Sequence, residues 1–245
     1  VYPIATQAVG AEGRAVPTRN WGHDLDAMAA AIDENTRVVF VANPNNPTGT
    51  WFDAAALGGF LARVPERVLV VLDEAYIEYA EGQEWPDGLA FLADYTNLLV
   101  SRTFSKAYGL AALRVGYAIS SPVIADVLNR VRQPFNVNSL ALTAACAALD
   151  DVDYLLASRK ANDAGMLQLE TGFRQLGLKW IPSRGNFIAV NFARDAAPIN
   201  QALLREGVIV RPMAGYGMPT FLRISIGTEQ ENARFLDVLH QVLAQ

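Results

Sequence analysis

Cysteine, histidine and long apolar runs are scarce in this chain of 245 residues. The single cysteine, Cys146, cannot form a disulfide within the chain, which fits a reducing compartment such as the cytoplasm. Two distant histidines, His23 and His240, leave few ligands for zinc, so we expect no metal site. No apolar run is long enough to cross a bilayer, and the chain does not begin with a targeting signal. We therefore expect no membrane partner.

Positive charge is also sparse and dispersed. The chain has 20 Lys and Arg against 25 Asp and Glu, a net charge of -5, and contains no basic block. Nucleic acid is therefore not expected as a partner. Apolar residues make up 51% of the chain, which is enough for a substantial core and argues against disorder. Because the chain begins with Val1 rather than Met, we expect it to be part of a longer protein.

Apolar runs alternate with helical patterns in the first half of the chain. Residues 37–42, 68–72 and 98–100 are continuous apolar runs of the kind found in parallel strands buried on both faces. Helical spacing at 24–32 and 53–64 predicts right-handed β-α-β units and a mainly parallel sheet covered by helices. Further strands are expected around residues 13–17 and at 114–120, with a short helix at 88–94.

The second half begins with helices predicted at 122–132, 140–149 and 154–176, interrupted at 133–138. Strands and helices then alternate less strictly, with strands at 186–192, 208–211 and 221–227 and helices at 197–206 and 229–243. These patterns divide the chain into residues 1–135, part of a large α/β domain, and residues 136–245, a small C-terminal α+β domain.

Polar side chains follow the three apolar strands of the first half, at the point where each strand ends. The carboxyl ends of parallel strands meet at one edge of a sheet, where open α/β sheets bind ligands. We therefore expect the following residues to converge: Asn46 after the first strand, Asp73 and Tyr76 after the second, and Thr103, Ser105 and Lys106 after the third.

The residue types at this edge fit one ring-shaped cofactor. A desolvated lysine at Lys106 loses its proton easily and can form an imine with an aldehyde. A poorly solvated carboxylate at Asp73 needs a cationic partner, such as a protonated pyridine nitrogen. Asn46 and Tyr76 can donate to a phenolic oxygen. A phosphate would be held by donors from Thr103, Ser105 and, eight residues past the lysine, Arg114. These requirements together describe pyridoxal 5′-phosphate, whose ring acts as an electron sink.

Each of these residues also has a simpler interpretation. The lysine and arginine could be surface residues in ordinary ion pairs, the aspartate a helix cap, and the tyrosine a core residue. The asparagine could close its own turn, and the two hydroxyl residues could cap a helix. The functional interpretation is preferred because all of them fall at strand ends in one consistent order.

The sequence motifs resemble the fold-type I pyridoxal-phosphate aminotransferases. The resemblance is carried by Asn46-Pro47-Thr48-Gly49, by Asp73-x-x-Tyr76, and by Ser105-Lys106 followed by Arg114. The longer segments 43–49, 132–138 and 221–227 are similar to the histidinol-phosphate aminotransferase family. This resemblance implies transamination between imidazole-acetol phosphate and L-glutamate in histidine biosynthesis, catalysed by Lys106, Asp73 and Tyr76.

The resemblance also implies substrate contacts and a partner. Arg223 would bind the anionic end of the substrate, because its fork fits a carboxylate or a phosphate. Arg211 is a second candidate for the substrate's phosphate, with a surface ion pair as the alternative, and Asn186 is a weaker candidate. Members of the family are homodimers. Full-length members also have an upstream region that carries a Gly-rich phosphate turn and an aromatic residue that stacks on the cofactor ring. This aromatic residue would lie just before Val1, close to Tyr2.

Three alternatives are also compatible with the sequence. A lyase resembling threonine-phosphate decarboxylases would use the same lysine, aspartate and arginine. An aromatic aminotransferase would differ only in the shape of its pocket. The third alternative is a fragment that folds without holding the cofactor.

Overall fold

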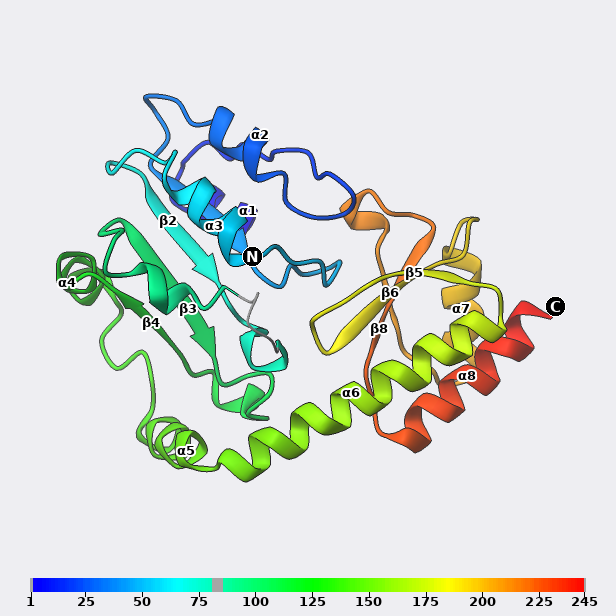
Figure 1. Ribbon diagram of the computed structural model, residues 1–245. Coiled ribbons are helices and arrows are strands. Elements are labelled where there is room, and N and C mark those ends of the chain that lie inside the picture. The colour runs from blue at the N-terminus through cyan, green and yellow to red at the C-terminus, as the bar shows by residue number, and fades with distance from the viewer. Residues whose placement is uncertain (1, 81–85, 245) are drawn as a thin grey trace.

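The computed structural model describes residues 2–80 and 86–244, and these residues form two sheets with separate cores. The long helix α6 (Val152–Gln175) runs from the side of the first sheet to the second (Figure 1). Within the described ranges, no helix has both the length and the apolar character needed to cross a membrane.

The first sheet has the order β1-β2-β3-β4. Strands β1 (Val38–Ala42), β2 (Leu69–Asp73) and β3 (Leu98–Thr103) are parallel, which confirms the interpretation of the three apolar runs. Strand β4 (Gly116–Ser120) pairs antiparallel with β3 and closes this end of the sheet. The carboxyl ends of β1, β2 and β3 therefore lie along one edge.

Helices cover one face of this sheet because their apolar sides bury against it. Helix α3 (Ala54–Leu61) begins at the N-cap Asp53, whose carboxylate accepts from Ala56 N at 2.8 Å. Helix α2 (Leu25–Ala30) and the 3₁₀ helix η2 (Gly88–Phe91), which lies within the predicted 88–94 helix, complete this layer. The buried core comprises Leu25, Val41, Leu57, Phe60, Leu61, Val64, Val68, Val70, Leu72, Leu98 and Val100.

The N-terminal part of the chain differs from one expectation. Helix α1 (Tyr2–Ala8) has no buried residue and contacts the sheet through the ring of Tyr2, which stacks on Phe40 of β1. The strand predicted around residues 13–17 is wrong, because this segment is an exposed loop. Strands need a neighbour to satisfy their backbone hydrogen bonds, and this segment, which contains Gly13 and Pro17, pairs with none of the described strands.

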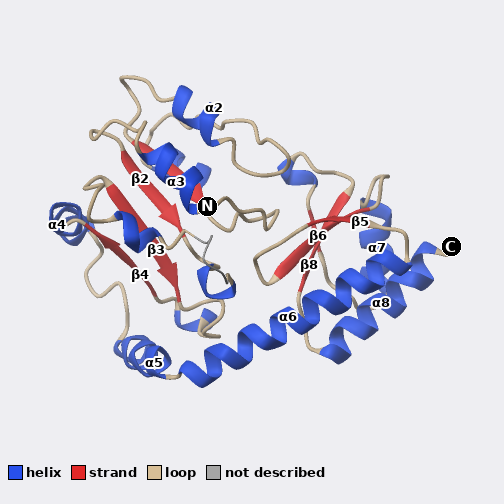
Figure 2. Cartoon of the chain, in the orientation of Figure 1, coloured by secondary structure: helices blue, strands red, loops and turns tan. Residues whose placement is uncertain are grey.

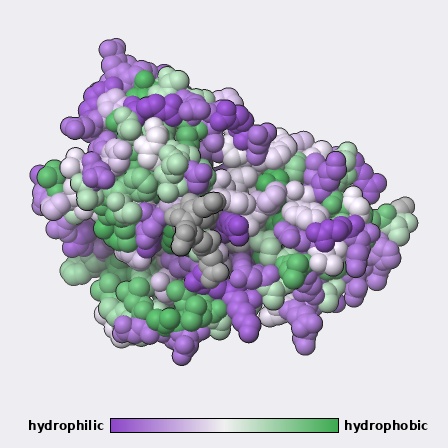
Figure 3. Space-filling model, viewed as in Figure 1, coloured by the Kyte–Doolittle hydropathy of each residue, from purple (hydrophilic) through white to green (hydrophobic). Residues whose placement is uncertain are grey.

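Helices follow the first sheet before the chain crosses to the second. The 3₁₀ helices η1 (Ile77–Tyr79) and η3 (Ala111–Leu113) flank the strand ends, and α4 (Pro122–Val131) follows β4. Helix α5 (Ser139–Asp150) packs Ala141 and Ala145 against Phe104 and Val115. Its outer side carries the exposed residues Leu140, Leu142 and Leu149, and apolar surface gathers in this region in Figure 3.

The second sheet is antiparallel, in the order β5-β6-β8-β7. Its strands are β5 (Lys179–Ile181), β6 (Phe187–Asn191), β7 (Arg211–Pro212) and β8 (Phe221–Ser225). The sequence analysis missed β5 because three residues are too short for a pattern. The strand predicted at 208–211 is wrong except at Arg211, because β7 covers only Arg211–Pro212. Helices α6, α7 (Ala197–Arg205) and α8 (Glu229–Leu243) bury a core on this sheet (Figure 2). The 3₁₀ helix η4 (Ala214–Tyr216) lies between β7 and β8.

The two sheets and their cores are consistent with two structural units. The division at residue 136 stays a prediction, because α5 follows that residue in the chain and packs with residues of the first sheet and the loop after it.

Candidate active site

Three strand ends bring together an amide, a phenol and an amine. After β1, the amide nitrogen of Asn46 donates to the hydroxyl of Tyr76 at 3.2 Å. After β3, the ammonium of Lys106 lies 5.4 Å from the centroid of the Tyr76 ring. β2 itself ends at Asp73, three residues before Tyr76. These four residues therefore lie at the sheet edge where the sequence placed them.

The loop after β1 has its own internal hydrogen bonds, which leave Asn46 free for the site. Asn45 accepts from Gly49 N at 2.7 Å through its carbonyl, and its amide nitrogen donates to the hydroxyl of Thr48 at 3.0 Å. The turn is therefore closed by the side chain of Asn45 and not by that of Asn46. Gly49 has φ +78, and a Cβ there would overlap the side chain of Ser183, so the close approach of the β5–β6 connection requires glycine.

Asp73 is held by two donors. Its Oδ1 accepts from Ala75 N at 3.1 Å, and its Oδ2 accepts from the hydroxyl of Tyr2 at 2.5 Å. The contact with Tyr2 was missed by the sequence reasoning, which considered Tyr2 only as a neighbour of the ring-stacking position. No pattern in the sequence indicates it, because the two residues are 71 positions apart.

The pKa shifts of Lys106 and Tyr76 follow from burial and from nearby arginines. Desolvation lowers the pKa of the Lys106 ammonium, and the positive charges of Arg223 and Arg114 lower it further. A lysine with a lowered pKa is more often the neutral nucleophile that imine formation requires. Burial raises the pKa of Tyr76 even though Arg223 opposes this shift, so Tyr76 keeps its proton and remains a donor.

Hydroxyl and guanidinium groups gather beside the lysine. Arg114 donates from Nη1 to the hydroxyl of Ser105 at 3.3 Å and to the carbonyl of Ala111 at 2.7 Å. Ser105 N donates to the hydroxyl of Thr103 at 3.1 Å. Two hydroxyls and a guanidinium therefore meet next to Lys106, an arrangement suited to an anion with several oxygens.

The second sheet contributes Arg223, on β8, to the same site. Its Nη1 donates to the amide oxygen of Asn46 at 2.5 Å, and its guanidinium lies 4.8 Å from the centroid of the Phe187 ring. Its Nε is buried without a hydrogen-bond partner among the described residues. A buried donor of this kind is costly unless a ligand satisfies it. Arg223 is therefore prepared to bind an acceptor that the protein itself does not supply.

The other two substrate candidates occupy different positions. Arg211 is exposed and lies directly opposite Arg223 in the β7–β8 ladder, so the two arginines share one face of the sheet. Asn186 precedes β6, and its side chain bonds the hydroxyl of Tyr79. The neighbouring Phe187 contacts the ring of Tyr76 edge-on at 5.2 Å. Asn186 therefore contacts η1 through Tyr79, while its neighbour Phe187 contacts Tyr76.

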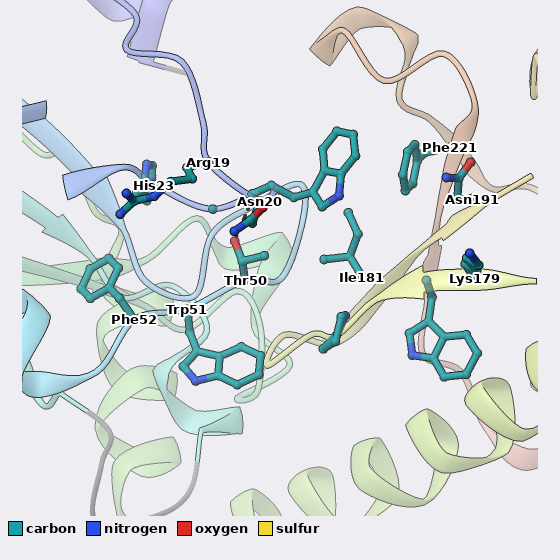
Figure 4. Close-up of a pocket in the computed structure, with 14 residues that line it drawn as sticks. Arg19, Asn20, His23, Thr50, Trp51, Phe52, Lys179, Ile181, Asn191 and Phe221 are labelled. Atoms are coloured by element: carbon teal, nitrogen blue, oxygen red, sulfur yellow. Dashed lines mark hydrogen bonds between the residues drawn. The ribbon is translucent and has the colours of Figure 1, made fainter. Parts of the chain in front are cut away.

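A separate cavity of about 530 Å³ opens elsewhere between the two sheets (Figure 4). It is lined by the 19–23 loop, the 50–52 segment, residues around β5, Asn191 and Phe221. Trp21 packs edge-on against Phe221 on one side of it, with ring centroids 5.0 Å apart. None of the polar residues gathered around Lys106 lines this cavity.

Comparison with known proteins identifies the class of this chain. Residues 2–239 match the family described as aminotransferase class I and II, and the chain belongs to that family. The fold is that of the fold-type I pyridoxal-phosphate-dependent transferases, with a mainly parallel sheet covered by helices.

Among its relatives, histidinol-phosphate aminotransferase 2 of Pseudomonas aeruginosa is 78% identical over 244 residues, which are 100% of this chain and 66% of the relative. Histidinol-phosphate aminotransferase of Stutzerimonas stutzeri is 64% identical over 248 residues, with the same coverage. The chain thus spans just under two thirds of the length of these relatives.

A solved structure carries the cofactor. Histidinol-phosphate aminotransferase from Sinorhizobium meliloti in complex with pyridoxal-5′-phosphate superposes with a TM-score of 0.93 at 33% identity, covering 99% of this chain and 67% of that one. The residues around Lys106 in the present chain fit pyridoxal 5′-phosphate, since they include a lysine of lowered pKa, an aspartate held by two donors, and hydroxyl and guanidinium donors beside the lysine.

Proposed function

We propose that the protein is a histidinol-phosphate aminotransferase, which exchanges an amino group between imidazole-acetol phosphate and L-glutamate. The proposal is supported by the relatives, which are histidinol-phosphate aminotransferases, and by the buried Nε of Arg223, which has no partner among the described residues although Arg223 contacts Asn46. When bound, pyridoxal 5′-phosphate withdraws electrons from the substrate carbon that loses its proton.

The residues that would hold the cofactor come from the first sheet. Asp73 would accept from the ring nitrogen, and Asn46 and Tyr76 would donate to the phenolic oxygen. The hydroxyl of Tyr76 accepts from Asn46, which leaves its own proton available for that donation. The phosphate would be bound by Thr103, Ser105 and Arg114, and the aldehyde by the amine of Lys106.

Lys106 would also move the proton. Its amine, which lies beside the ring of Tyr76, would be the base that accepts the substrate's proton. The lowered pKa of Lys106 increases the share of neutral amine, the form that can accept a proton. Arg223, held by Asn46, would orient the substrate by binding its anionic end.

Two opposed arginines would explain how one site accepts two different anions. Like charges directly across an antiparallel pair destabilise each other, and an anion between Arg211 and Arg223 would relieve that repulsion. Glutamate brings carboxylates and the imidazole substrate a phosphate, and a guanidinium fork fits both. Arg223 would serve both substrates, whereas the more exposed Arg211 would serve mainly the phosphate.

The proposal includes a partner and a location. The family resemblance supports a homodimer, and the lone cysteine supports a cytoplasmic enzyme. Small molecules, an amino acid and a phosphorylated imidazole compound, would be its substrates.

Steady-state kinetics with both substrates test this function. Replacing Lys106 with Ala should leave cofactor binding measurable and abolish transamination. Arg223→Met should raise KM for glutamate and for histidinol phosphate, each by about 10-fold or more, since a charge-assisted hydrogen bond is lost. Arg211→Met should raise KM mainly for histidinol phosphate. Arg205→Met, at the exposed end of α7, is the matched control and should change neither.

Two results would overturn the assignment. Normal turnover by Lys106→Ala would remove the proposed base. Release of carbon dioxide from phosphothreonine by the wild-type protein, without amino transfer to 2-oxoglutarate, would favour the lyase.

A further inference from the structure

Tyr2 links the N-terminal helix to the aspartate of the active site. It is the first residue of α1, and its ring stacks on Phe40 with centroids 4.7 Å apart and planes 12° from parallel. From this position its hydroxyl donates to Asp73 Oδ2 at 2.5 Å. No residue of α1 is fully buried, and Tyr2 joins the helix to the sheet through its stacked ring and its hydrogen bond.

The geometry around Asp73 restricts how its carboxylate can turn. The backbone N–H of Ala75 donates to one oxygen and Tyr2 to the other. With one donor on each oxygen, rotation about the Cβ–Cγ bond would break a hydrogen bond. A carboxylate has about four acceptor positions, so a third donor can still bind without displacing these two. A ring nitrogen bearing a proton is such a donor.

We propose that Tyr2 is a positioning residue, whose hydroxyl fixes the carboxylate of Asp73 so that it meets the ring nitrogen of the cofactor. This inference rests on the proposed function and adds a residue to the site. The fixed carboxylate keeps the ring nitrogen protonated, and the charged ring in turn lowers the proton affinity of the cofactor–lysine linkage.

The electrostatics of Tyr2 suit this role. Desolvation and the negative charge of Asp73 both raise the pKa of Tyr2, so the hydroxyl keeps its proton over the working range of pH. It therefore stays a donor to Asp73 and does not become a competing anion. The stacking on Phe40 holds the phenol in place without occupying its hydroxyl.

Tyr2→Phe tests the proposal because it removes the hydroxyl and retains the ring. The measurement is the pH titration of the visible absorption of the bound cofactor, together with kcat and KM for glutamate. We expect the titration midpoint of the cofactor–lysine linkage to rise by about half a unit to one unit. We also expect kcat to fall by about 10-fold, with KM nearly unchanged, because Asp73 does not contact the substrate's anionic end.

Two further variants separate positioning from folding. Tyr95→Phe removes a phenolic hydroxyl from the segment that precedes β3, away from Asp73, and should behave like the wild type. Phe40→Leu removes the stacking partner and keeps the hydroxyl, so its shift should be smaller than that of Tyr2→Phe. A general loss of structure would affect Phe40→Leu at least as much as Tyr2→Phe.

The outcomes separate the role of Tyr2 from the proposed function of the protein. A wild-type protein with a normal cofactor band and transamination, combined with an unshifted midpoint in Tyr2→Phe, would overturn the role of Tyr2 alone. A Phe40→Leu shift equal to that of Tyr2→Phe would also overturn it, since packing would then suffice as the cause. A wild-type protein that holds no cofactor would overturn the proposed function and, with it, this inference.

Discussion

Replacing Arg102 with Met should leave the buried carboxylate of Glu74 without its cationic partner. Glu74 follows Asp73 in the chain, and its side chain is 1% exposed against 14% for Arg102. Arg102 donates to Glu74 Oε2 from Nε at 2.9 Å and approaches it from Nη2 at 2.8 Å. The other oxygen of Glu74 accepts from Gly88 N at 2.7 Å. The arrangement satisfies both oxygens, so removal of the cation has a cost that a surface pair would not have.

The expected loss of unfolding free energy is about 3 kcal/mol, the low end of the range for breaking a buried pair, because Arg102 is partly solvated and also contacts the exposed Asp87. The pH dependence follows from Glu74. Burial already raises its pKa in the folded protein, and Arg102 opposes that rise. Without Arg102 the folded-state pKa rises further above the unfolded value. The folded state then binds the proton more tightly, so stability is lost as pH rises between the unfolded and the folded pKa.

Urea unfolding, followed by tryptophan fluorescence at about pH 5 and about pH 8, measures this effect. The destabilisation of Arg102→Met should be larger at the higher pH. Arg102→Met combined with Glu74→Gln is the matched control, because the amide can still accept from Gly88 and carries no charge. It should recover part of the lost stability and lose the additional pH dependence. Equal destabilisation at both pH values, without recovery in the double variant, would refute the reasoning.

Three further outcomes are expected. Gly49→Ala should lower the free energy of unfolding by about 1–3 kcal/mol and weaken cofactor binding, since the new Cβ overlaps Ser183 and displaces the loop that carries Asn46. An unchanged urea midpoint together with unchanged cofactor affinity would contradict this prediction. Borohydride should reduce the imine between Lys106 and pyridoxal phosphate at a lower pH than for an ordinary lysine, because the pKa of Lys106 is lowered. A pH profile of labelling that matches a free lysine side chain would argue against the site. Thr228→Ala should lower the free energy of unfolding in urea by about 1 kcal/mol, because it removes the capping box of α8. Thr228→Ser keeps the hydroxyl cap and serves as the control.

The secondary structure of the first sheet could be predicted from the sequence because its signals are local. Continuous β-branched runs indicate buried parallel strands, and the polar residues after them must lie at one edge of such a sheet. Short strands were harder to predict. β5 has three residues and β7 has two, so neither shows a period, and both depend on pairing with β6 and β8. The wrongly predicted strand at 13–17 had an acceptable composition but no neighbour with which to pair.

The sequence by itself determined which chemical groups lie at the candidate site, since an amide, a carboxylate, a phenol, hydroxyls and an amine follow successive strands in a fixed order. Tertiary structure decided which of these groups touch. Tyr2 reaches Asp73 across 71 positions, and Arg223 reaches Asn46 across 177. Contacts at such separations depend on how α1 lies on the first sheet and how the second sheet packs beside it. Neither arrangement is encoded in a local pattern, because packing depends on the shape of both surfaces at once.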